Sequence, residues 1–194
     1  MIPLMKTRLI LASQSPRRRQ LLLEAGIDFD VIPSQVDESA FDPTEGTPET
    51  YACRLARAKA GEVAQRFPQC WVLGADTIVD CQGEIIGKPK DRNDAERITR
   101  RIFSSPHRVI TGLALIRLDQ GVEKVESQYT TVFPRPLSEE QIAAHLEGGT
   151  WQGKAGAYAI QETGDALVER LEGSLSNVIG LPMEKVTQWL AEIE

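Results

Sequence analysis

The amino-acid sequence predicts an α/β fold built on a mixed β-sheet, and three patterns indicate it. Strand-like apolar segments alternate with helix-like segments from Arg8 to Arg66. The run Cys70–Asp80 is dense in Val, Leu and Ile, as expected of a buried strand. Two further strand-like segments, 108–118 and 123–133, are joined only by Asp119-Gln120-Gly121, which indicates an antiparallel hairpin. Helices therefore interleave with strands while a hairpin is also present, and we expect a twisted mixed sheet flanked by helices.

The first third of the chain contains local signals for where helices begin and end. Ser15 is placed to cap a helix that has Pro16 at its first position and closes at Gly26. Thr47-Pro48-Glu49 is a second helix start, and the stretch between these helices is polar, acidic and rich in Pro and Gly. The elements expected here are a strand at 8–12, a helix to about 25, a strand at 29–33, a loop at 34–47 and a helix to about 66.

The rest of the chain alternates in the same way. Gln82-Gly83 is typical of a turn, and Ser138-Glu139-Glu140-Gln141 is a capping box that opens a helix. After the strand at 70–80 we expect a short strand at 84–86, a helix at 91–103, the hairpin, a helix at 138–147, short strands near 156–160 and 166–172, and a last helix at 182–193.

Composition excludes several classes of protein. A length of 194 residues suits one domain, over 1–194, and no apolar run approaches the roughly 20 residues of a membrane span. The formal charge of −6 argues against binding of a nucleic acid polymer, which needs many Lys and Arg contacts to phosphate. The three cysteines form no CxxC pair, so a disulfide framework or thiolate zinc site is not expected and a reducing cytoplasm fits. Only two histidines are present, so a bound metal would be a hard ion such as Mg²⁺ or Mn²⁺, held by oxygen.

The segment Ser13–Arg19 is the first candidate for binding chemistry. A strand leads into a tight polar turn and a helix N-terminus, where free backbone N–H groups attract an anion. Three arginines in the first helical turn oppose the helix dipole, and a bound phosphate chain would reverse that disadvantage. The alternative is a basic surface turn whose arginines pair with acids elsewhere.

Lys59 and Lys88 are two further candidate cations. Lys59 lies on the apolar face of its helix, where a lysine either extends to water or meets an anion in a cleft. Lys88 lies in Gly87-Lys88-Pro89, where the proline restricts its backbone and lowers the entropy lost on gripping a phosphate. Ordinary turn chemistry explains Gly87-Lys88-Pro89 equally well.

Two acids complete the set of candidates. Asp76 lies in Gly74-Ala75-Asp76-Thr77, inside the most apolar strand, where an ionised carboxylate is costly unless it is paired or bound to metal. It suits a metal ligand or a general base, and equally an aspartate that accepts hydrogen bonds from a turn. Glu38 lies in the acidic loop after the second strand and could complete a metal site with Asp76, although loop acids are usually solvated.

Taken together, these segments resemble the Maf family of nucleoside triphosphate pyrophosphatases, and the match covers nearly the whole chain. No single motif is specific for this family, but the order and spacing of the motifs together are. The residues that carry the resemblance are 11–18 (LASQSPRR), 36–38 (VDE), 54–60 (RLARAKA), 74–77 (GADT), 87–89 (GKP), 107–112 (HRVITG), 153–161 (GKAGAYAIQ), 173–174 (GS) and 177–182 (NVIGLP).

The resemblance implies a Maf/ITPase-like fold with two lobes around a cleft, a divalent metal cofactor and often a homodimer. It also implies hydrolysis of a nucleoside triphosphate between the α- and β-phosphates. By the same resemblance Asp76 is the proton acceptor, Glu38, Lys59 and Lys88 are the other cleft residues, and Ser13 and Arg18 are phosphate-binding groups. We further expect Asp76 and Glu38 to hold the metal.

Three positions match the branch of the family that hydrolyses dTTP and UTP: Arg17, Thr77 and Gln161. The branch acting on 7-methyl-GTP would carry Trp, Gln and Glu there. A glutamine offers both a donor and an acceptor, which suits the edge of uracil or thymine. Two alternatives stay open at this point, namely a pyrophosphatase for 7-methyl-GTP or other modified nucleotides, and a nucleotide-binding regulator of cell division without turnover.

Overall fold

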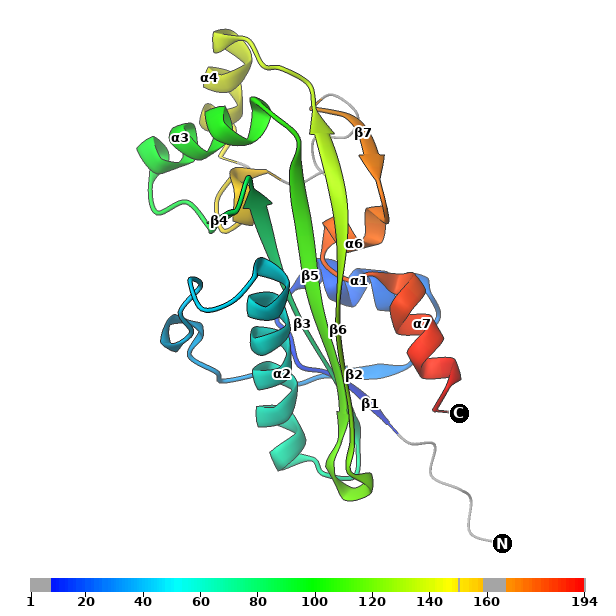
Figure 1. Cartoon of the computed structure of the whole chain (residues 1–194). Coiled ribbons are helices and arrows are strands. Elements are labelled where there is room, and N and C mark those ends of the chain that lie inside the picture. The colour runs from blue at the N-terminus through cyan, green and yellow to red at the C-terminus, as the bar shows by residue number, and fades with distance from the viewer. Residues whose placement is uncertain (1–7, 150, 159–166, 194) are drawn as a thin grey trace, which may run out of the picture. The chain divides into compact units, whose positions relative to one another are not determined.

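The computed structural model describes residues 8–149, 151–158 and 167–193, and it confirms the α/β fold on a mixed sheet (Figure 1). The strands lie in the order β2-β1-β3-β5-β6-β7, with β4 paired to β3. The β1–β2 and β1–β3 pairs are parallel, whereas β3–β4 and β6–β7 are antiparallel. The elements are β1 (Leu9–Leu11), α1 (Pro16–Glu24), β2 (Phe29–Val31), η1 (Glu38–Ala40), α2 (Pro48–Arg66), β3 (Trp71–Cys81), β4 (Glu84–Ile86), α3 (Arg92–Phe103), β5 (His107–Arg117), η2 (Leu118–Gln120), β6 (Val122–Pro134), α4 (Glu139–Glu147), η3 (Ala155–Ala157), β7 (Val168–Glu172), α6 (Leu175–Ile179) and α7 (Met183–Ala191).

The chain divides into two compact units. The first unit contains the described residues up to Asp76, Gly112–Ser127 and those from Met183 onward. The second contains Thr77–Thr111 and the described residues from Gln128 to Pro182. Strands β3, β5 and β6 contribute residues to both units.

In the first unit, α2 packs on the sheet through a cluster of small and branched apolar side chains. Alternate residues of a strand face the same side of a sheet. Ile10 of β1 and Ala12, which follows β1, therefore face α2, as does Val72 of β3. The buried members of this cluster are Ile10, Ala12, Ala56, Ala60, Val63, Ala64, Val72, Ala114 and Ile116.

Two glycines set how closely α2 approaches the sheet. A Cβ at Gly74 of β3 would lie less than 3.0 Å from the backbone of Ala56 and Ala60, and a Cβ at Gly112 of β5 would overlap the backbone of Ala52. Ala52, Ala56 and Ala60 follow one another at four-residue spacing, so they form one small-residue stripe along α2. Glycine facing alanine therefore lets the helix backbone come almost directly against β3 and β5.

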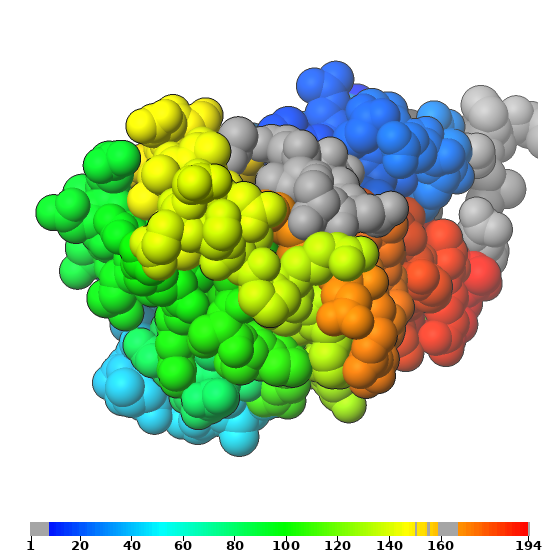
Figure 2. Space-filling view, turned by 90° about the horizontal axis from the view of Figure 1, so that it is seen from above, coloured from blue at the N-terminus to red at the C-terminus, as the bar shows by residue number. Residues whose placement is uncertain are grey.

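The second unit has its own apolar core between its strands and helices α3 and α4. Figure 2 shows α3 (green) and α4 (yellow) side by side at the surface, and Arg100 of α3 forms an ion pair with Glu139 of α4 at 2.6 Å. Beneath them, His107 Nε2 lies 2.9 Å from the hydroxyl of Tyr158. Burial lowers the pKa of His107 to about 4, so its imidazole is neutral inside this core.

Most predicted elements agree with the structure to within one or two residues, and the predicted helix starts at Ser15, Thr47 and Ser138 are confirmed as capping residues. The predicted strand near 156–160 is wrong over its described part, because Ala155–Ala157 form a 3-10 turn with Gly156 at φ 73°. The short helix α6 was not predicted. No helix in the described ranges is both long enough and apolar enough to cross a membrane.

Gly112→Ala tests the close approach of α2. The added methyl group would meet helix backbone, which cannot move away as a flexible side chain can. We expect the free energy of unfolding to fall by about 3 kcal/mol, as in other overpacked cores. Gly61→Ala is the matched control, because nothing lies within 4 Å of a Cβ there, and it should raise stability by about 0.5–1 kcal/mol. Equal stabilities of the two variants in urea unfolding would contradict the packing described.

Candidate active site

Three parallel strands of the first unit bring functional segments to one edge of the sheet. Leu11, the last residue of β1, is in register with Val31 of β2 and Leu73 of β3. The segments beyond these residues contain the Ser13 turn, the Glu38 loop and Asp76, respectively. The connection from β1 runs to β2 on one side, and the connection from β2 runs back past β1 to β3 on the other. Ligands of open α/β sheets bind beyond the strand ends where the strand order reverses in this way. The topology therefore makes this edge the candidate position for a binding site.

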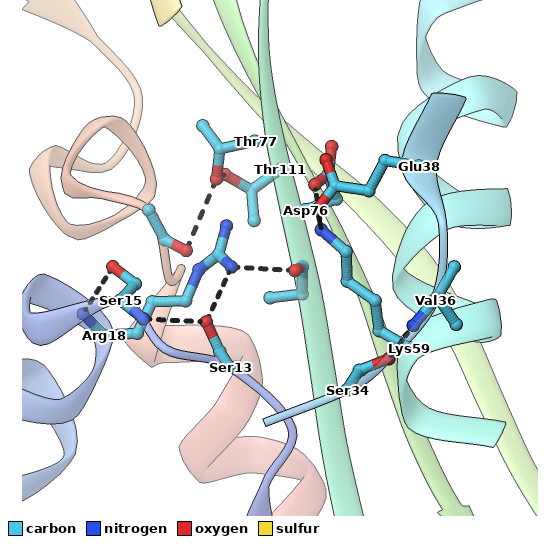
Figure 3. A network of polar contacts seen from close by, with 12 residues as sticks. Ser13, Ser15, Arg18, Ser34, Val36, Glu38, Lys59, Asp76, Thr77 and Thr111 are labelled. Atoms are coloured by element: carbon cyan, nitrogen blue, oxygen red, sulfur yellow. Dashed lines mark hydrogen bonds and ion pairs between the residues drawn. The ribbon is translucent and has the colours of Figure 1, made fainter. Parts of the chain in front are cut away.

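A lysine and two carboxylates meet at this edge. The Nζ atom of Lys59 lies 2.6 Å from Oδ1 of Asp76 and 2.7 Å from Oε1 of Glu38 (Figure 3). The side chains of Lys59 and Asp76 are 12% and 11% exposed, whereas that of Glu38 is 51% exposed. Glu38, Lys59 and Asp76 are called the Lys59 cluster below. Lys59 thus contacts anions instead of extending to water, and Asp76 is paired.

The close packing of α2 explains why these residues meet. Asp76 lies two residues beyond Gly74, so both face α2. Ala60 packs against Gly74, and this places its neighbour Lys59 beside the strand at the level of Asp76. Glu38 reaches the same ammonium from η1, whose first turn is capped by Asp37 accepting the N–H of Ser39 at 3.0 Å. The Lys59 cluster therefore links η1, α2 and β3.

The Ser13 turn forms a second polar group beside β3. Ser15 caps α1 by accepting from the N–H of Arg18, and Ser13 Oγ accepts from the N–H of Ser15 at 3.2 Å. The Arg18 guanidinium is buried and donates through Nη1 to Ser13 Oγ at 3.1 Å and to the carbonyl of Ala75 at 2.8 Å. Arg18 thereby holds the backbone of the residue that precedes Asp76.

The electrostatics of Arg18 reflect this position. Burial lowers the pKa of its guanidinium, and the charge of Asp76 opposes that shift. The neighbouring charge of Arg17 lowers the pKa further, while Glu38 raises it. Arg18 is thus within the field of both carboxylates of the Lys59 cluster.

The remaining predicted residues lie outside this group or outside the described ranges. Arg17 is half-buried in the first turn of α1. Lys88 and Thr77 belong to the second unit, where Lys88 is exposed after β4 and Thr77 is half-buried in β3. Gln161 lies outside the described residues. The convergence of Lys88 and Gln161 with the Lys59 cluster stays a prediction.

Two buried polar residues of the second unit were not singled out from the sequence. Thr111 lies at the centre of β5 and its hydroxyl is 2.9 Å from that of Thr77. Asn177 lies in α6, and both residues are completely buried. In the sequence, Thr111 and Asn177 stand out only because they lie in the segments 107–112 and 177–182, which resemble the Maf family.

The two carboxylates of the Lys59 cluster suit a hard divalent cation. Within the described ranges, no three His, Cys, Asp or Glu side chains gather as a metal cage. Asp76 and Glu38 nevertheless both contact the same cationic atom, so the pair is able to share a cation. Mg²⁺ is typically held by one or two carboxylates together with substrate phosphates and water, so this donor set fits it.

Comparison with known proteins covers almost the entire chain. The sequence model of the family described as Maf-like protein matches residues 8–193. A dTTP/UTP pyrophosphatase of Geotalea uraniireducens is 45% identical over 185 residues, which are 95% of this chain and 94% of that protein. A dTTP/UTP pyrophosphatase of Geobacter sulfurreducens is 44% identical over 189 residues, covering 97% of each chain. Among solved structures, a HAM1 protein from Coxiella burnetii covers 96% of this chain and 99% of its own, with 14% identity and a TM-score of 0.48.

Lys59→Met tests the pairing in the Lys59 cluster. It leaves two carboxylates facing each other, one of them buried, so we expect the free energy of unfolding to fall by about 3 kcal/mol. Arg57→Met is the matched control on the same helix, since Arg57 pairs with Glu123 where the side chains are 62% and 41% exposed. It should cost less than about 1 kcal/mol. Similar losses in the two variants during urea unfolding would show that Lys59 is not a buried partner.

Proposed function

This chain belongs to the Maf-like protein family, and from that membership we infer that it hydrolyses nucleoside triphosphates to the monophosphate and pyrophosphate. The relatives named dTTP/UTP pyrophosphatase, 44–45% identical over nearly the whole chain, support dTTP and UTP as its substrates. The observation that carries the chemistry is the buried carboxylate of Asp76, held by an ammonium at the ligand-binding edge of a parallel sheet.

Asp76 is the proposed proton acceptor. A water molecule attacks the α-phosphorus, its proton passes to the carboxylate, and the bond to the β-phosphate breaks to release pyrophosphate. The contact at 2.6 Å with Lys59 fixes one carboxylate oxygen, and the contact of Arg18 with Ala75 fixes the backbone beside it. Such positioning is what general-base catalysis requires.

The metal proposal assigns a divalent cation, Mg²⁺ or Mn²⁺, to Asp76 and Glu38. When bound there, the cation would neutralise charge on the phosphate oxygens. Lys59 keeps the two carboxylates at one place in the site. Glu38, which is half-exposed, is the more accessible of the two acids.

The other predicted residues have proposed roles in binding the substrate. Ser13 and the arginines Arg17 and Arg18 bind phosphate, and Lys88 adds positive charge that stabilises the departing pyrophosphate. Thr77 and Gln161 contact the base, by resemblance to the dTTP/UTP branch. A site that hydrogen-bonds its base discriminates strongly, because a mismatched base leaves buried polar groups unpaired.

A substrate panel tests the function. Pyrophosphate release is measured with Mg²⁺ and equal concentrations of dTTP, UTP, CTP, 7-methyl-GTP and ITP. We expect dTTP and UTP to react at least about tenfold faster than the others. A base that leaves one hydrogen-bonding group of the site unpaired loses at least that factor in rate. No release from any nucleotide would overturn the enzymatic proposal, and a preference for 7-methyl-GTP would overturn the assigned branch. Full activity with excess EDTA would remove only the metal from the proposal.

Asp76→Asn tests the proton acceptor. The amide keeps the shape of the side chain but cannot accept the proton, so we expect kcat with UTP to fall at least about 100-fold. Asp80→Asn is the matched control, because Asp80 is also buried in β3 but accepts from Arg108 at 2.9 Å and from the N–H of Gly83. It should retain kcat within about threefold at a temperature where both variants are folded. Activity retained by Asp76→Asn would exclude it as the base.

A further inference from the structure

The segment 37–45, between β2 and α2, carries Glu38 but is not fixed by burial in a core. Every residue from 34 to 47 lies in the described part of the chain, and none of them is buried. Figure 1 shows this segment (blue) alongside α2 (cyan). Its contacts with the helix therefore decide where Glu38 lies. Four of its nine residues are acids, namely Asp37, Glu38, Asp42 and Glu45.

Charged residues of α2 hold the chain on the side of Glu38 that leads back to β2. Glu62 accepts from the N–H of Gln35 at 3.1 Å, and Lys59 contacts Glu38 at 2.7 Å. Because Lys59 precedes Glu62 by one turn of the helix, the segment runs along α2 toward the N-terminus of the helix. The part of the segment that follows Glu38 needs a further group to hold it.

Arg54 is the residue of α2 that holds this following part. Its Nη2 lies 2.8 Å from Glu45 Oε2, and its Nη1 donates to the carbonyl of Glu45 at 3.3 Å. Its guanidinium also lies over the ring of Phe41, with Cζ 5.8 Å from the ring centroid, which is a cation–π contact. Phe41 donates its N–H to the carbonyl of Glu38 at 3.2 Å, so the ring is linked to Glu38 through the single turn of η1. The planar fork of one arginine thus holds the segment at two points.

We propose that Arg54 is a positioning residue that holds Glu38 at the Lys59 cluster. It acts through Phe41 and Glu45, which fix the backbone on the far side of Glu38 from Lys59. A carboxylate that is already in place loses less entropy when Glu38 and Asp76 share a cation. The inference rests on the proposed function, since it takes Glu38 as a ligand of Mg²⁺ or Mn²⁺.

Hydrogen exchange of the segment 37–45 tests whether Arg54 holds it, and this measurement needs neither metal nor nucleotide. In Arg54→Met we expect the amides of the segment to exchange about fivefold faster, because an exposed ion pair and a cation–π contact are lost. Arg57→Met is the matched control on the same helix, since Arg57 pairs with Glu123 of β6, which lies outside the segment. It should leave the exchange of 37–45 unchanged in mass spectrometry.

The Mg²⁺ dependence of UTP hydrolysis tests the consequence for Glu38. At saturating UTP, Arg54→Met should raise the Mg²⁺ concentration that gives half the maximal rate by about fivefold, since preorganisation of Glu38 is lost. In the Glu38→Gln background the same change should alter that concentration less than about twofold, because a residue that acts through another adds nothing once the other is gone. A direct effect of charge has the opposite sign, because removing a positive charge near two acids favours binding of a cation.

The possible failures of the inference and of the proposed function are distinguishable. Unchanged exchange of 37–45 in Arg54→Met would show that Arg54 does not hold the segment. An unchanged or lower half-maximal Mg²⁺ concentration, or an equal rise with and without Glu38→Gln, would show that Arg54 does not act through Glu38. Turnover without a divalent cation would overturn the inference and leave the enzymatic proposal intact. A wild-type protein that releases no pyrophosphate would overturn the proposed function, while hydrogen exchange would still decide whether Arg54 holds the segment.

Discussion

The ion contacts of Lys59 with Asp76 and Glu38 are the constraint on which the candidate site depends. A carboxylate as buried as Asp76 is stable inside an apolar strand only with a partner, and Lys59 is that partner. The ammonium can reach it only because α2 lies almost against β3, which in turn requires glycine at position 74 and alanine opposite it. The small residues on the sheet-facing side of α2 are therefore needed for the contact between Lys59 and Asp76.

The order of the parallel strands explains why residues distant in sequence share this site. Because β1 lies between β2 and β3, the loops that follow β1 and β2 open beside the part of β3 that carries Asp76. Arg18 illustrates how these segments are tied together, since from α1 it donates hydrogen bonds both to the carbonyl of Ala75 and to Ser13 Oγ. A cation expected from the sequence to bind phosphate thus also organises the strand that carries the proposed base.

The sequence predicted those features that local chemistry determines. Helix starts were predictable because Ser15, Thr47 and Ser138 cap through contacts three residues away. The strand predicted near 156–160 was wrong because a short run of mostly apolar residues does not reveal the positive φ of Gly156. Helix α6 was missed since its five residues are too few for a periodic signal, and its stability comes from tertiary contacts. The pairing of Lys59 with Asp76 needed the packing of α2, which no local pattern encodes.

The charges of the Lys59 cluster favour turnover over simple binding. The two carboxylates offset the positive charges of Lys59 and of the neighbouring Arg18, so they weaken the attraction of this edge for a triphosphate. A protein that only binds a nucleotide would do better with the acids absent, since Lys59 and the arginines alone would attract the phosphates. A divalent cation held by the two acids would restore the attraction for phosphate, which is the situation proposed for metal-assisted hydrolysis. Asp76 and Glu38 therefore reduce the affinity of this edge for phosphate, and the proposed chemistry at the phosphorus accounts for their presence.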